Sequence, residues 1–407
     1  MLYRLLTTLF LFFLKITSIF SSKSRYFLDT RKNIYSSVKK SLSKKDQVIW
    51  FHCASLGEFE QARPLIEKSK SIYIDHKILL TFFSPSGYEI QKKYELADCI
   101  CYLPFDTPKN INLFINQFNL KVLFLIKYEF WPELLNQLYL RKIKIYSISS
   151  VFRKEQLFFK FYGVFFRKIL KKIDHFFLQD DYSSDLLNSI GIYNTSIIGD
   201  TRIDRVLKIK ELDLTFEEIS NFKNSNKCLV LGSTWDEDYE MLLNKIHLFP
   251  NLKIIIAPHK IDLISIKKLI DRLTMPYAKL SSYNASNDKE KSILIIDSIG
   301  ILSKVYSYAD IAYVGGGMGT KGLHNTMEPA VFQIPIIIGK NYKNFNEVKE
   351  LVLLGGILSV RNNEEFNKTI DLLLNNSSKR KALGKINYDY VWSKAGASLK
   401  IFNKLKI

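Results

Sequence analysis

A glycine-rich stretch, GGGMGTKGLHNTMEPA at residues 315–330, combines residue types that suit a phosphorylated ligand. It follows an apolar run at residues 311–314 that is typical of a buried strand. Five glycines in its first eight residues allow the backbone to turn sharply and to lie close to a ligand. Asn325, Glu328 and Pro329 then mark a helix start. This order predicts an anion site, because free N–H groups and the helix dipole both attract negative charge.

Glu328 lies in or beside the first turn of that predicted helix. A carboxylate at this place can accept hydrogen bonds from the two adjacent hydroxyls of a ribose. The alternative is that Asn325 and Glu328 only cap the helix. The glycine-rich stretch alone favours neither interpretation.

Two further carboxylates directly follow apolar runs. Glu58 follows the run at residues 48–53, and Glu129 follows the run at residues 122–126. Open α/β sheets bind their ligands at the carboxyl ends of their strands. Both carboxylates are therefore candidates for a ligand site.

Each of these carboxylates also has a purely structural interpretation. Ser55 and Glu58 have the spacing of a helix capping box. Glu129 is flanked by a cation and by bulky rings, and a salt bridge to Lys127 is its alternative role.

Apolar runs that alternate with helical patterns predict two successive α/β halves, each with a mostly parallel sheet. The predicted strands are residues 48–53, 78–83, 122–126, 143–148 and 176–178 in the first half, and 228–231, 253–257, 293–296, 311–314 and 335–338 in the second. Loops that follow parallel strands share one sheet edge. We therefore expect the loops of the second half to gather beside the glycine-rich stretch.

Composition limits the partners and the compartment. The chain has 407 residues, which suits two domains, and 59 Lys and Arg against 40 Asp and Glu give a formal charge of +19. This surplus favours an anionic partner such as a membrane surface, a phosphorylated substrate or nucleic acid. The four cysteines form no CxxC pair, so we expect neither a disulfide framework nor a zinc site. We expect the protein to lie in a reducing compartment.

Residues 1–20 are apolar and aromatic, and a Lys/Arg-rich segment follows at residues 23–45. No small-residue cleavage site of a secretory signal is evident. The positive-inside rule places the main body in the cytoplasm. We interpret residues 1–20 as an N-terminal membrane anchor, either a tilted span or a helix in the interface, and a domain-packing helix is the alternative.

Residues 158–172 interleave aromatic and basic side chains. As a helix they would form a basic amphipathic surface that suits contact with a membrane, and a core helix with solvated lysines is the alternative. Single-stranded nucleic acid can bind through the same chemistry, but no nucleic-acid module is recognisable.

Six motifs in order give a specific resemblance. The segments HCASLGE, KYEFWP, GDTRIDRV, GSTWDED, PHK and GGGMGTKGLHNTMEPA resemble those of the 3-deoxy-D-manno-octulosonic acid (Kdo) transferases, glycosyltransferase family 30. The resemblance covers nearly the whole chain. It implies a GT-B fold, with two Rossmann-like domains facing a central cleft and an N-terminal membrane-associated helix.

The resemblance and the patterns together predict five segments. They are a membrane anchor helix (1–20), a Rossmann-like acceptor-binding domain (21–206), a polar linker (207–227), a Rossmann-like CMP-Kdo-binding domain (228–387) and a C-terminal helix that can pack back on the first domain (388–407).

The family transfers Kdo from CMP-Kdo to a hydroxyl of the lipid A precursor, with inversion and without a metal or another cofactor. The resemblance assigns Glu58 as the proton acceptor and Glu129 and Arg202 as transition-state stabilisers. A fixed cation such as Arg202 can offset charge on the leaving phosphate or hold the Kdo carboxylate.

The resemblance also implies the residues that bind CMP. They are Pro258, His259, Gly300, Ile301, Leu302, Asn325, Thr326, Met327 and Glu328, with Ser233, Thr234, Gly316 and Gly317 as further donor contacts. Glu328 would hold the ribose. The implied partners are CMP-Kdo, the lipid A precursor and anionic lipids at the cytoplasmic face of a cell inner membrane, and not nucleic acid.

Two departures from the family pattern concern substrate contacts. Many members have Ala-Arg-Leu-Ser where this chain has the run Ser149 to Arg153, so Arg153 either replaces the missing arginine or the arginine is absent. Many also have Gly-Pro where this chain has Gly339 and Lys340.

Two other functions fit parts of the same pattern. A GT-B transferase that moves a sugar from a UDP-sugar to a membrane lipid needs the same fold and differs only in base recognition. A catalytically inert membrane scaffold is the third possibility, and the joint presence of Glu58, Glu129, Arg202 and Glu328 argues against it.

Overall fold

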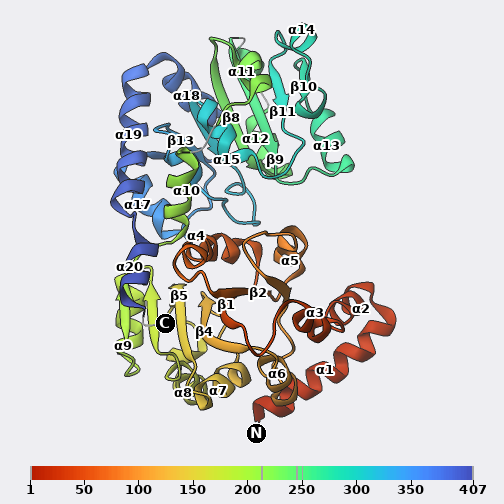
Figure 1. Cartoon of the computed structure of the whole chain (residues 1–407). Coiled ribbons are helices and arrows are strands. Elements are labelled where there is room, and N and C mark those ends of the chain that lie inside the picture. The colour runs from red at the N-terminus through yellow and green to blue at the C-terminus, as the bar shows by residue number, and fades with distance from the viewer. Residues whose placement is uncertain (1, 212–213, 244–245, 250, 406–407) are drawn as a thin grey trace. The chain divides into compact units, whose positions relative to one another are not determined.

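The computed structural model describes residues 2–211, 214–243, 246–249 and 251–405. The chain forms two compact units (Figure 1). The first contains the residues up to Arg205 and those from Gly396 onward, and the second runs from Val206 to Ala395. The C-terminal segment therefore belongs to the same unit as the N-terminus.

The first unit is built on a parallel seven-stranded sheet in the order β3-β2-β1-β4-β5-β6-β7. Its strands are β1 (Gln47–Cys53), β2 (His76–Phe82), β3 (Cys99–Tyr102), β4 (Asn119–Ile126), β5 (Lys144–Ser150), β6 (His175–Leu178) and β7 (Thr195–Ile197). Its helices are α1 (Leu2–Phe20), α2 (Ser22–Asp29), α3 (Ile34–Ser41), α4 (Leu56–Ile72), α5 (Pro85–Gln91), α6 (Pro108–Ile115), α7 (Pro132–Leu140), α8 (Val164–Leu170), α9 (Asp181–Asn188) and α20 (Ala397–Lys404).

Helices cover both faces of this sheet, so its central strands are apolar on both sides. Val48 and Trp50 of β1 pack into a cluster with residues of α3, α6 and α7. Ile49 and Phe51 point the other way, into a cluster that contains residues of α4 and α20. The near-continuous apolar runs of the sequence are explained by this two-sided burial.

The second unit repeats this architecture, with a parallel sheet in the order β10-β11-β9-β8-β12-β13-β14. Its strands are β8 (Lys227–Thr234), β9 (Leu252–Pro258), β10 (Tyr277–Lys279), β11 (Ile293–Ile295), β12 (Ile311–Val314), β13 (Ile336–Ile338) and β14 (Ile357–Ser359). Its helices are α11 (Glu217–Lys223), α12 (Asp236–Leu242), α13 (Leu263–Ile270), α14 (Ala285–Asp288), α15 (Leu302–Val305), α16 (Met327–Ala330), α17 (Asn346–Leu354), α18 (Asn363–Asn375) and α19 (Ser377–Ser393), and α10 (Arg202–Lys210) leads into it from the first unit.

The fold class predicted from the sequence is confirmed. Every predicted strand is present, and the four strands that were not predicted are β3, β7, β10 and β14. All four lie at the edges of their sheets. All four cysteines are buried and unpaired, as a role in the core requires.

Two stretches differ from their predicted secondary structure, and the predicted linker contains helical residues. Within residues 158–172 only α8 is α-helical, because Arg167 donates hydrogen bonds to the carbonyls of Phe158, Lys160 and Phe161 and holds them in a loop. The predicted linker, residues 207–227, contains the end of α10 and all of α11. The C-terminal stretch from residue 388 is two helices, α19 and α20, separated by Gly396 at φ +89°.

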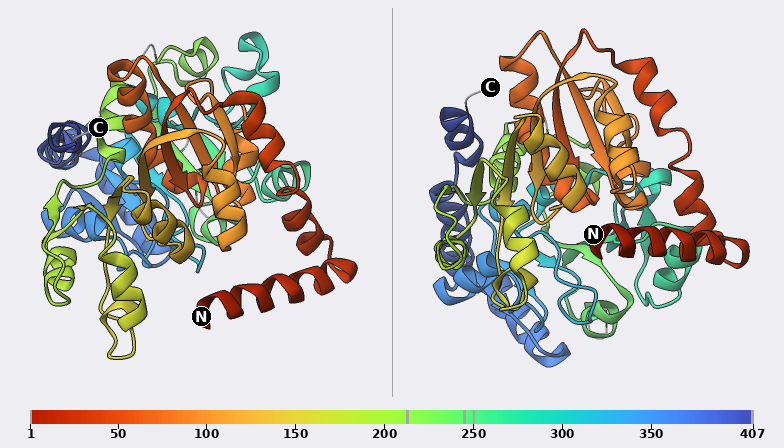
Figure 2. Two further views of the ribbon diagram at one scale, coloured as in Figure 1. Left: turned by 60° about the horizontal axis from the view of Figure 1, so that its bottom comes forward. Right: turned by 90° about the horizontal axis from the view of Figure 1, so that it is seen from below.

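Helix α1 is rich in Leu and Phe, is interrupted by Arg4 and Lys15, and has no buried residue. Figure 2 shows it running along the outside of the first unit. Its length and mean hydropathy of 1.5 would allow it to cross a membrane. Near its start, Tyr3 donates to Asp106 (2.7 Å) and Arg4 forms an ion pair with Glu133 (2.8 Å). Asp106 also accepts two backbone N–H groups in the first turn of α7, so this end of α1 is tied to the body of the unit.

Asp204 ties the C-terminal helix to the first unit. Its carboxylate accepts hydrogen bonds from the backbone N–H groups of Gly396 (2.7 Å) and Ser398 (2.6 Å), at the start of α20. The Asp204→Ala substitution should therefore destabilise the docking of α20 by about 1–2 kcal/mol, the usual cost of a lost helix cap. Amide hydrogen exchange in residues 397–404 should accelerate about tenfold.

The matched control for this measurement is Asp389→Ala. Asp389 is exposed and pairs only with Lys385 one turn away on α19, so exchange in α20 should not change. Unchanged exchange in Asp204→Ala would mean that the buried Ala397 and Ile401 hold α20 without the cap.

Candidate functional site

The two candidate carboxylates of the first unit flank the point where the strand order of its sheet reverses. Strands β1 and β4 are neighbours and pair in parallel, although two strands lie between them in sequence. Glu58 follows β1 and Glu129 follows β4. Loops on the two sides of such a switch point diverge and leave room for a ligand.

Glu58 lies in the first turn of α4 and is mostly buried. Its Oε2 atom accepts a hydrogen bond from the backbone N–H of Ala54. Ser55 is the N-cap residue, but its side chain makes no capping hydrogen bond, so the capping box that the spacing suggested does not form. Burial raises the pKa of the Glu58 carboxyl, and the negative charge of Glu129 raises it further.

Glu129 is held by an aromatic ring and lies beside a histidine. The indole N–H of Trp131 donates to its Oε2 atom at 2.9 Å. The Nε2 atom of His52 lies 3.4 Å from the same oxygen. Lys127, which leads into this turn, adopts φ +60°. The positive charge of Lys127 works against the raised pKa of Glu58 and contributes to the lowered pKa of Asp200. Lys127 therefore acts on more than one carboxylate.

Arg202 is fixed at the start of α10 by Asp200. Its Nε and Nη2 atoms both donate to one oxygen of that carboxylate, at 2.8 and 2.5 Å. Burial would raise the pKa of Asp200, but the Arg202 guanidinium outweighs it, and the pKa is lowered. Gln61 of α4 donates to Asp200, and Thr201 donates to the Gln61 carbonyl at 2.7 Å. The loop that carries Arg202 is thus tied to the helix that carries Glu58.

The loop after β5, where the sequence departs from the family pattern, adjoins the same place. Ser149 adopts φ +52°, and its hydroxyl lies 3.1 Å from that of Thr201. Arg153 lies further along this loop, and its charge lowers the pKa of Tyr128, which burial raises. The charge of Arg153 is therefore felt at Tyr128, in the turn that contains Glu129.

In the second unit, the glycine-rich loop lies at the corresponding switch point, between β8 and β12. Gly315 packs so closely against the backbone of Ser233 and Thr234 that a Cβ atom would clash. Gly316 adopts φ +88°. The buried Asp238 of α12 accepts from the backbone N–H of Gly316 (3.0 Å), which fixes the start of the loop.

Three aromatic rings join the loops after β8, β9 and β12. Trp235 stacks on His259 with 4.1 Å between ring centroids, and His259 lies 4.6 Å from His324. The indole N–H of Trp235 donates to Nε2 of His324 at 2.9 Å, so a neutral His324 carries its proton on Nδ1. Burial lowers the pKa of His324 to about 4, and the His259 ring adds to the effect. Lys260 and Lys321 lie over the Trp235 ring.

Asn325 and Glu328 contact each other but do not form a capping box, because the N-cap residue of α16 is Thr326 and no side-chain capping hydrogen bond is present there. The Asn325 amide donates to Oε1 of Glu328 at 3.2 Å and accepts from the N–H of Met327 at 3.0 Å. This contact orients the Glu328 carboxylate at the start of α16 and is compatible with a ribose contact. The hydroxyl of Thr326 is buried and has no hydrogen-bond partner among the described residues.

The remaining candidates lie on the loops after β9, β11 and β13. Pro258 ends β9, and the backbone N–H of His259 donates to the Thr234 carbonyl at 2.9 Å. Gly300 adopts φ +89° after β11, and Ile301 and Leu302 begin α15. Lys340 follows Gly339, which packs on Gly317 too tightly for a side chain. A pocket beside these last residues also has Gly319 and Lys343 in its wall.

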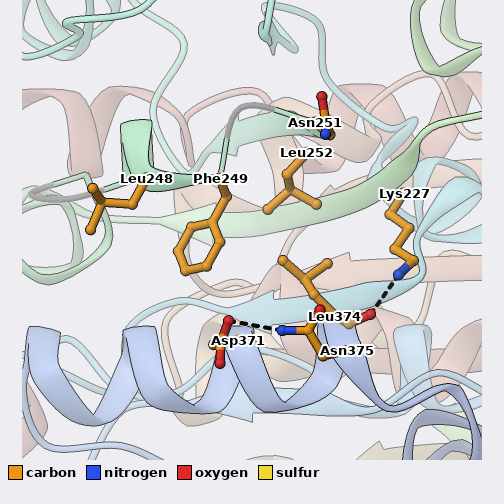
Figure 3. A pocket seen from close by; sticks show the side chains of 8 residues that line it. All are labelled: Lys227, Leu248, Phe249, Asn251, Leu252, Asp371, Leu374 and Asn375. Carbon is orange, nitrogen blue, oxygen red and sulfur yellow. Dashed lines mark hydrogen bonds between the residues drawn. The ribbon is translucent and has the colours of Figure 1, made fainter.

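A different pocket, drawn in Figure 3, lies at the end of this sheet where β8 and β9 begin, away from the loops that follow the strands. Lys227 and Leu252, the first residues of β8 and β9, form part of its wall, together with Asp371 and Asn375 of α18. None of the predicted site residues lines it. Within the described ranges, no group of three or more His, Cys, Asp and Glu side chains could hold a metal ion.

Sequence reasoning placed the candidate residues correctly at strand ends but missed several of their partners. His52, Asp200, Asp238 and His324 were not singled out by it. All four lie inside the motifs HCASLGE, GDTRIDRV, GSTWDED and GGGMGTKGLHNTMEPA, which were the available signal. The roles of His52, Asp238 and His324 could not be inferred from the motifs, because these residues contact other elements.

Comparisons with known proteins agree with this geometry. The family described as 3-deoxy-D-manno-octulosonic-acid transferase (kdotransferase) matches residues 28–205. A 3-deoxy-D-manno-octulosonic acid transferase of Haemophilus influenzae is 27% identical over 98% of this chain and 95% of its own length. A bifunctional glycosyltransferase/methyltransferase of Fusobacterium nucleatum is 32% identical over 82% of this chain, which spans only 53% of that relative.

Among solved structures, a UDP-GlcNAc 2-epimerase from Neisseria meningitidis bound to UDP-GlcNAc has a TM-score of 0.62, covering 88% of this chain and 98% of that one. At 14% identity this likeness shows the fold alone. The class of enzyme rests on two findings. One is the family match, and the other is the alignment with the Haemophilus influenzae relative over nearly the whole chain. The chain is a glycosyltransferase, and its residues 28–205 carry the domain of the Kdo transferase family.

Proposed function

We propose that this protein transfers Kdo from CMP-Kdo to a hydroxyl of the lipid A precursor lipid IVA, with inversion and without a metal, in lipopolysaccharide core biosynthesis. The observation that carries the proposal is the position of Glu58 and Glu129 on the two sides of the β1/β4 switch point, in a chain that carries this family's domain. The similarity of this chain to Kdo transferases supports Kdo as the sugar, and the two carboxylates support acid–base chemistry at the site.

Glu58 is the proton acceptor in this proposal. Its Oε2 atom is occupied by the Ala54 N–H, and Oε1 accepts no hydrogen bond from the described residues. The acceptor hydroxyl would lose its proton to Glu58 as its oxygen attacks the anomeric carbon and the bond from that carbon to the CMP phosphate breaks. The raised pKa of Glu58 makes it a stronger base than an exposed glutamate.

Arg202 and Glu129 stabilise the transition state. Arg202 keeps its guanidinium in place through Asp200, so no reorganisation is needed when charge develops on the leaving phosphate or when it holds the Kdo carboxylate. Glu129 supplies negative charge for oxocarbenium character at the anomeric carbon. The hydrogen bond from Trp131 fixes the direction of that carboxylate.

The second unit binds CMP in this proposal. The glycine-rich loop and the start of α16 face the phosphate, and Glu328 accepts from the ribose hydroxyls. The residues that contact CMP are Pro258, His259, Gly300, Ile301, Leu302, Asn325, Thr326, Met327 and Glu328, with Ser233, Thr234, Gly316 and Gly317 as further donor contacts. The stacked rings of Trp235, His259 and His324 support this binding surface.

The protein acts at the cytoplasmic face of a cell inner membrane in this proposal. The exposed apolar side of α1 continues in Phe161 and Phe165, and Tyr3 of α1 stacks on Phe165. These residues offer one apolar surface to the acyl region of a bilayer. The formal charge of +19 adds attraction to anionic headgroups and to the phosphates of the acceptor.

Replacement of the base tests the reaction. With enzymatically generated CMP-Kdo and lipid IVA in the presence of EDTA, Glu58→Gln should lower kcat by about 100- to 10,000-fold, while CMP still binds, because only the proton transfer is lost. Mass spectrometry of the lipid product measures the transfer. Glu67→Gln, on the exposed side of α4, is the control and should remain active.

Near-normal turnover by Glu58→Gln would remove Glu58 as the base. If the wild-type protein transfers no Kdo and binds UDP in place of CMP, the donor assignment is wrong and a UDP-sugar is the donor. If EDTA abolishes the wild-type activity, the reaction depends on a metal.

The pH dependence of kcat/KM tests the coupling of the two carboxylates. Glu58 must be ionised to act, so activity should fall as the pH falls through its raised pKa. Because the charge of Glu129 raises that pKa, Glu129→Gln should move the acid limb to lower pH, in addition to lowering the rate. If the acid limb stays at the same pH in Glu129→Gln, the ionisation of Glu58 does not cause that limb.

Vesicle co-sedimentation tests the apolar surface. The triple substitution Leu6→Ser, Phe10→Ser and Phe13→Ser, at side chains more than half exposed, should weaken binding to vesicles with anionic lipid at least tenfold, because the side chains can no longer bury apolar area in the bilayer. Leu353→Ser, at an apolar residue of α17 that is still more exposed, should leave binding unchanged.

A further inference from the structure

A buried histidine lies behind the candidate carboxylates. His52, the residue before the last one of β1, is fully buried. In the parallel pairing of β1 with β2 it lies opposite Thr81, and its Nδ1 atom is 2.8 Å from the Thr81 hydroxyl oxygen. Its Nε2 atom has no hydrogen-bond partner within the described residues and lies 3.4 Å from Oε2 of Glu129. A buried ring nitrogen without a partner needs an explanation.

The contacts of the Thr81 hydroxyl determine which ring nitrogen of His52 carries the proton. The indole N–H of Trp50 donates to the Thr81 hydroxyl oxygen at 2.8 Å, and an indole nitrogen can only donate. The other contact of that oxygen among the described side chains is Nδ1 of His52. Thr81 therefore satisfies its own O–H by donating to Nδ1. An Nδ1 atom that accepts leaves the ring proton on Nε2, and the Oε2 atom of Glu129 lies 3.4 Å from that nitrogen.

The opposite arrangement leaves a buried group unsatisfied. If Nδ1 carried a proton, the Thr81 oxygen would accept from both Trp50 and His52, and its own O–H would have no acceptor in a fully buried place. A buried polar group without a partner is costly. The same argument disfavours a doubly protonated imidazolium, so His52 acts as a neutral donor.

We propose that the chain Trp50–Thr81–His52 positions the carboxylate of Glu129 for transfer, with His52 in its Nε2–H form. His52 is a positioning residue that acts through Glu129. The indole N–H of Trp131 donates to Oε2, and Nε2 of His52 lies 3.4 Å from the same oxygen, so the two rings limit where this carboxylate can lie. The role in transfer rests on the proposed function, and the proton arrangement stands on the hydrogen bonds alone.

NMR of protein with ¹³C/¹⁵N-labelled histidine tests the proton arrangement. The chain has six histidines, and a His52→Gln spectrum assigns the signals of His52. We expect wild-type His52 to be neutral with its proton on Nε2. Thr81→Val removes the donor to Nδ1 and should shift the ring toward the Nδ1–H form or a mixture, and Thr81→Ser should restore the wild-type signals. A wild-type ring with its proton on Nδ1 would overturn the proposal.

Trp50→Phe gives a second test if Thr81→Val does not fold. It removes the indole donor but leaves Nδ1 of His52 as the acceptor for the Thr81 O–H among the described side chains. We therefore expect the ring to keep its proton on Nε2 in this variant. A ring that moves to the Nδ1–H form would overturn the proposed arrangement.

Kinetics test the role in transfer. Thr81→Val should lower kcat about tenfold while the KM for CMP-Kdo stays unchanged, and Thr81→Ser should restore the rate. Ser69→Ala is the control, because Ser69 of α4 is also a buried hydroxyl of this unit but has no hydrogen-bond partner in the described structure. Normal turnover by Thr81→Val in an active wild-type background overturns this inference alone. A wild-type protein that transfers no Kdo at all contradicts the proposed function instead.

Discussion

In each of the two units, the candidate residues depend on the point where the strand order of a wholly parallel sheet reverses. Because every strand points the same way, all the loops that follow strands lie at one edge of each sheet. At β1/β4 and at β8/β12 the chain leaves neighbouring strands toward opposite sides. The residues directly after those strands are then the only ones that a bound ligand can reach together. Glu58 and Glu129 occupy these places in the first unit, and Ser233 and the glycine-rich loop occupy them in the second.

A half-buried carboxylate beside a second negative charge imposes a cost on the first unit, and the surrounding residues offset it locally. The backbone N–H of Ala54 and the charge of Lys127 favour the ionised form of Glu58, whereas burial and Glu129 oppose it. The guanidinium of Arg202 is balanced by Asp200 in the adjacent loop. The balance leaves Glu58 with a raised pKa, which is the property that a general base requires near neutral pH.

The sequence predicted the central strands and the places of the candidate residues, but not the sheet edges or the second layer of the site. Central strands such as β1 and β12 are covered on both faces and therefore read as continuous apolar runs. The edge strands β7 and β14 are only partly buried and lack a continuous run of buried apolar residues. The role of His52 could not be inferred, because it depends on Thr81 and Glu129, which only the parallel pairing of the strands brings to it.

The motifs that revealed the family are made partly of residues that hold other residues. In GDTRIDRV, Asp200 orients Arg202, Asp204 caps α20, and Arg205 pairs with Glu60 of α4. In GSTWDED, Asp238 accepts from the backbone of the glycine-rich loop and from Tyr313. A carboxylate in a motif is therefore not evidence of chemistry by itself. What separates Glu58 from Asp204 is its surroundings: Asp204 uses both oxygens on backbone N–H groups, whereas Glu58 keeps one oxygen without a hydrogen bond among the described residues.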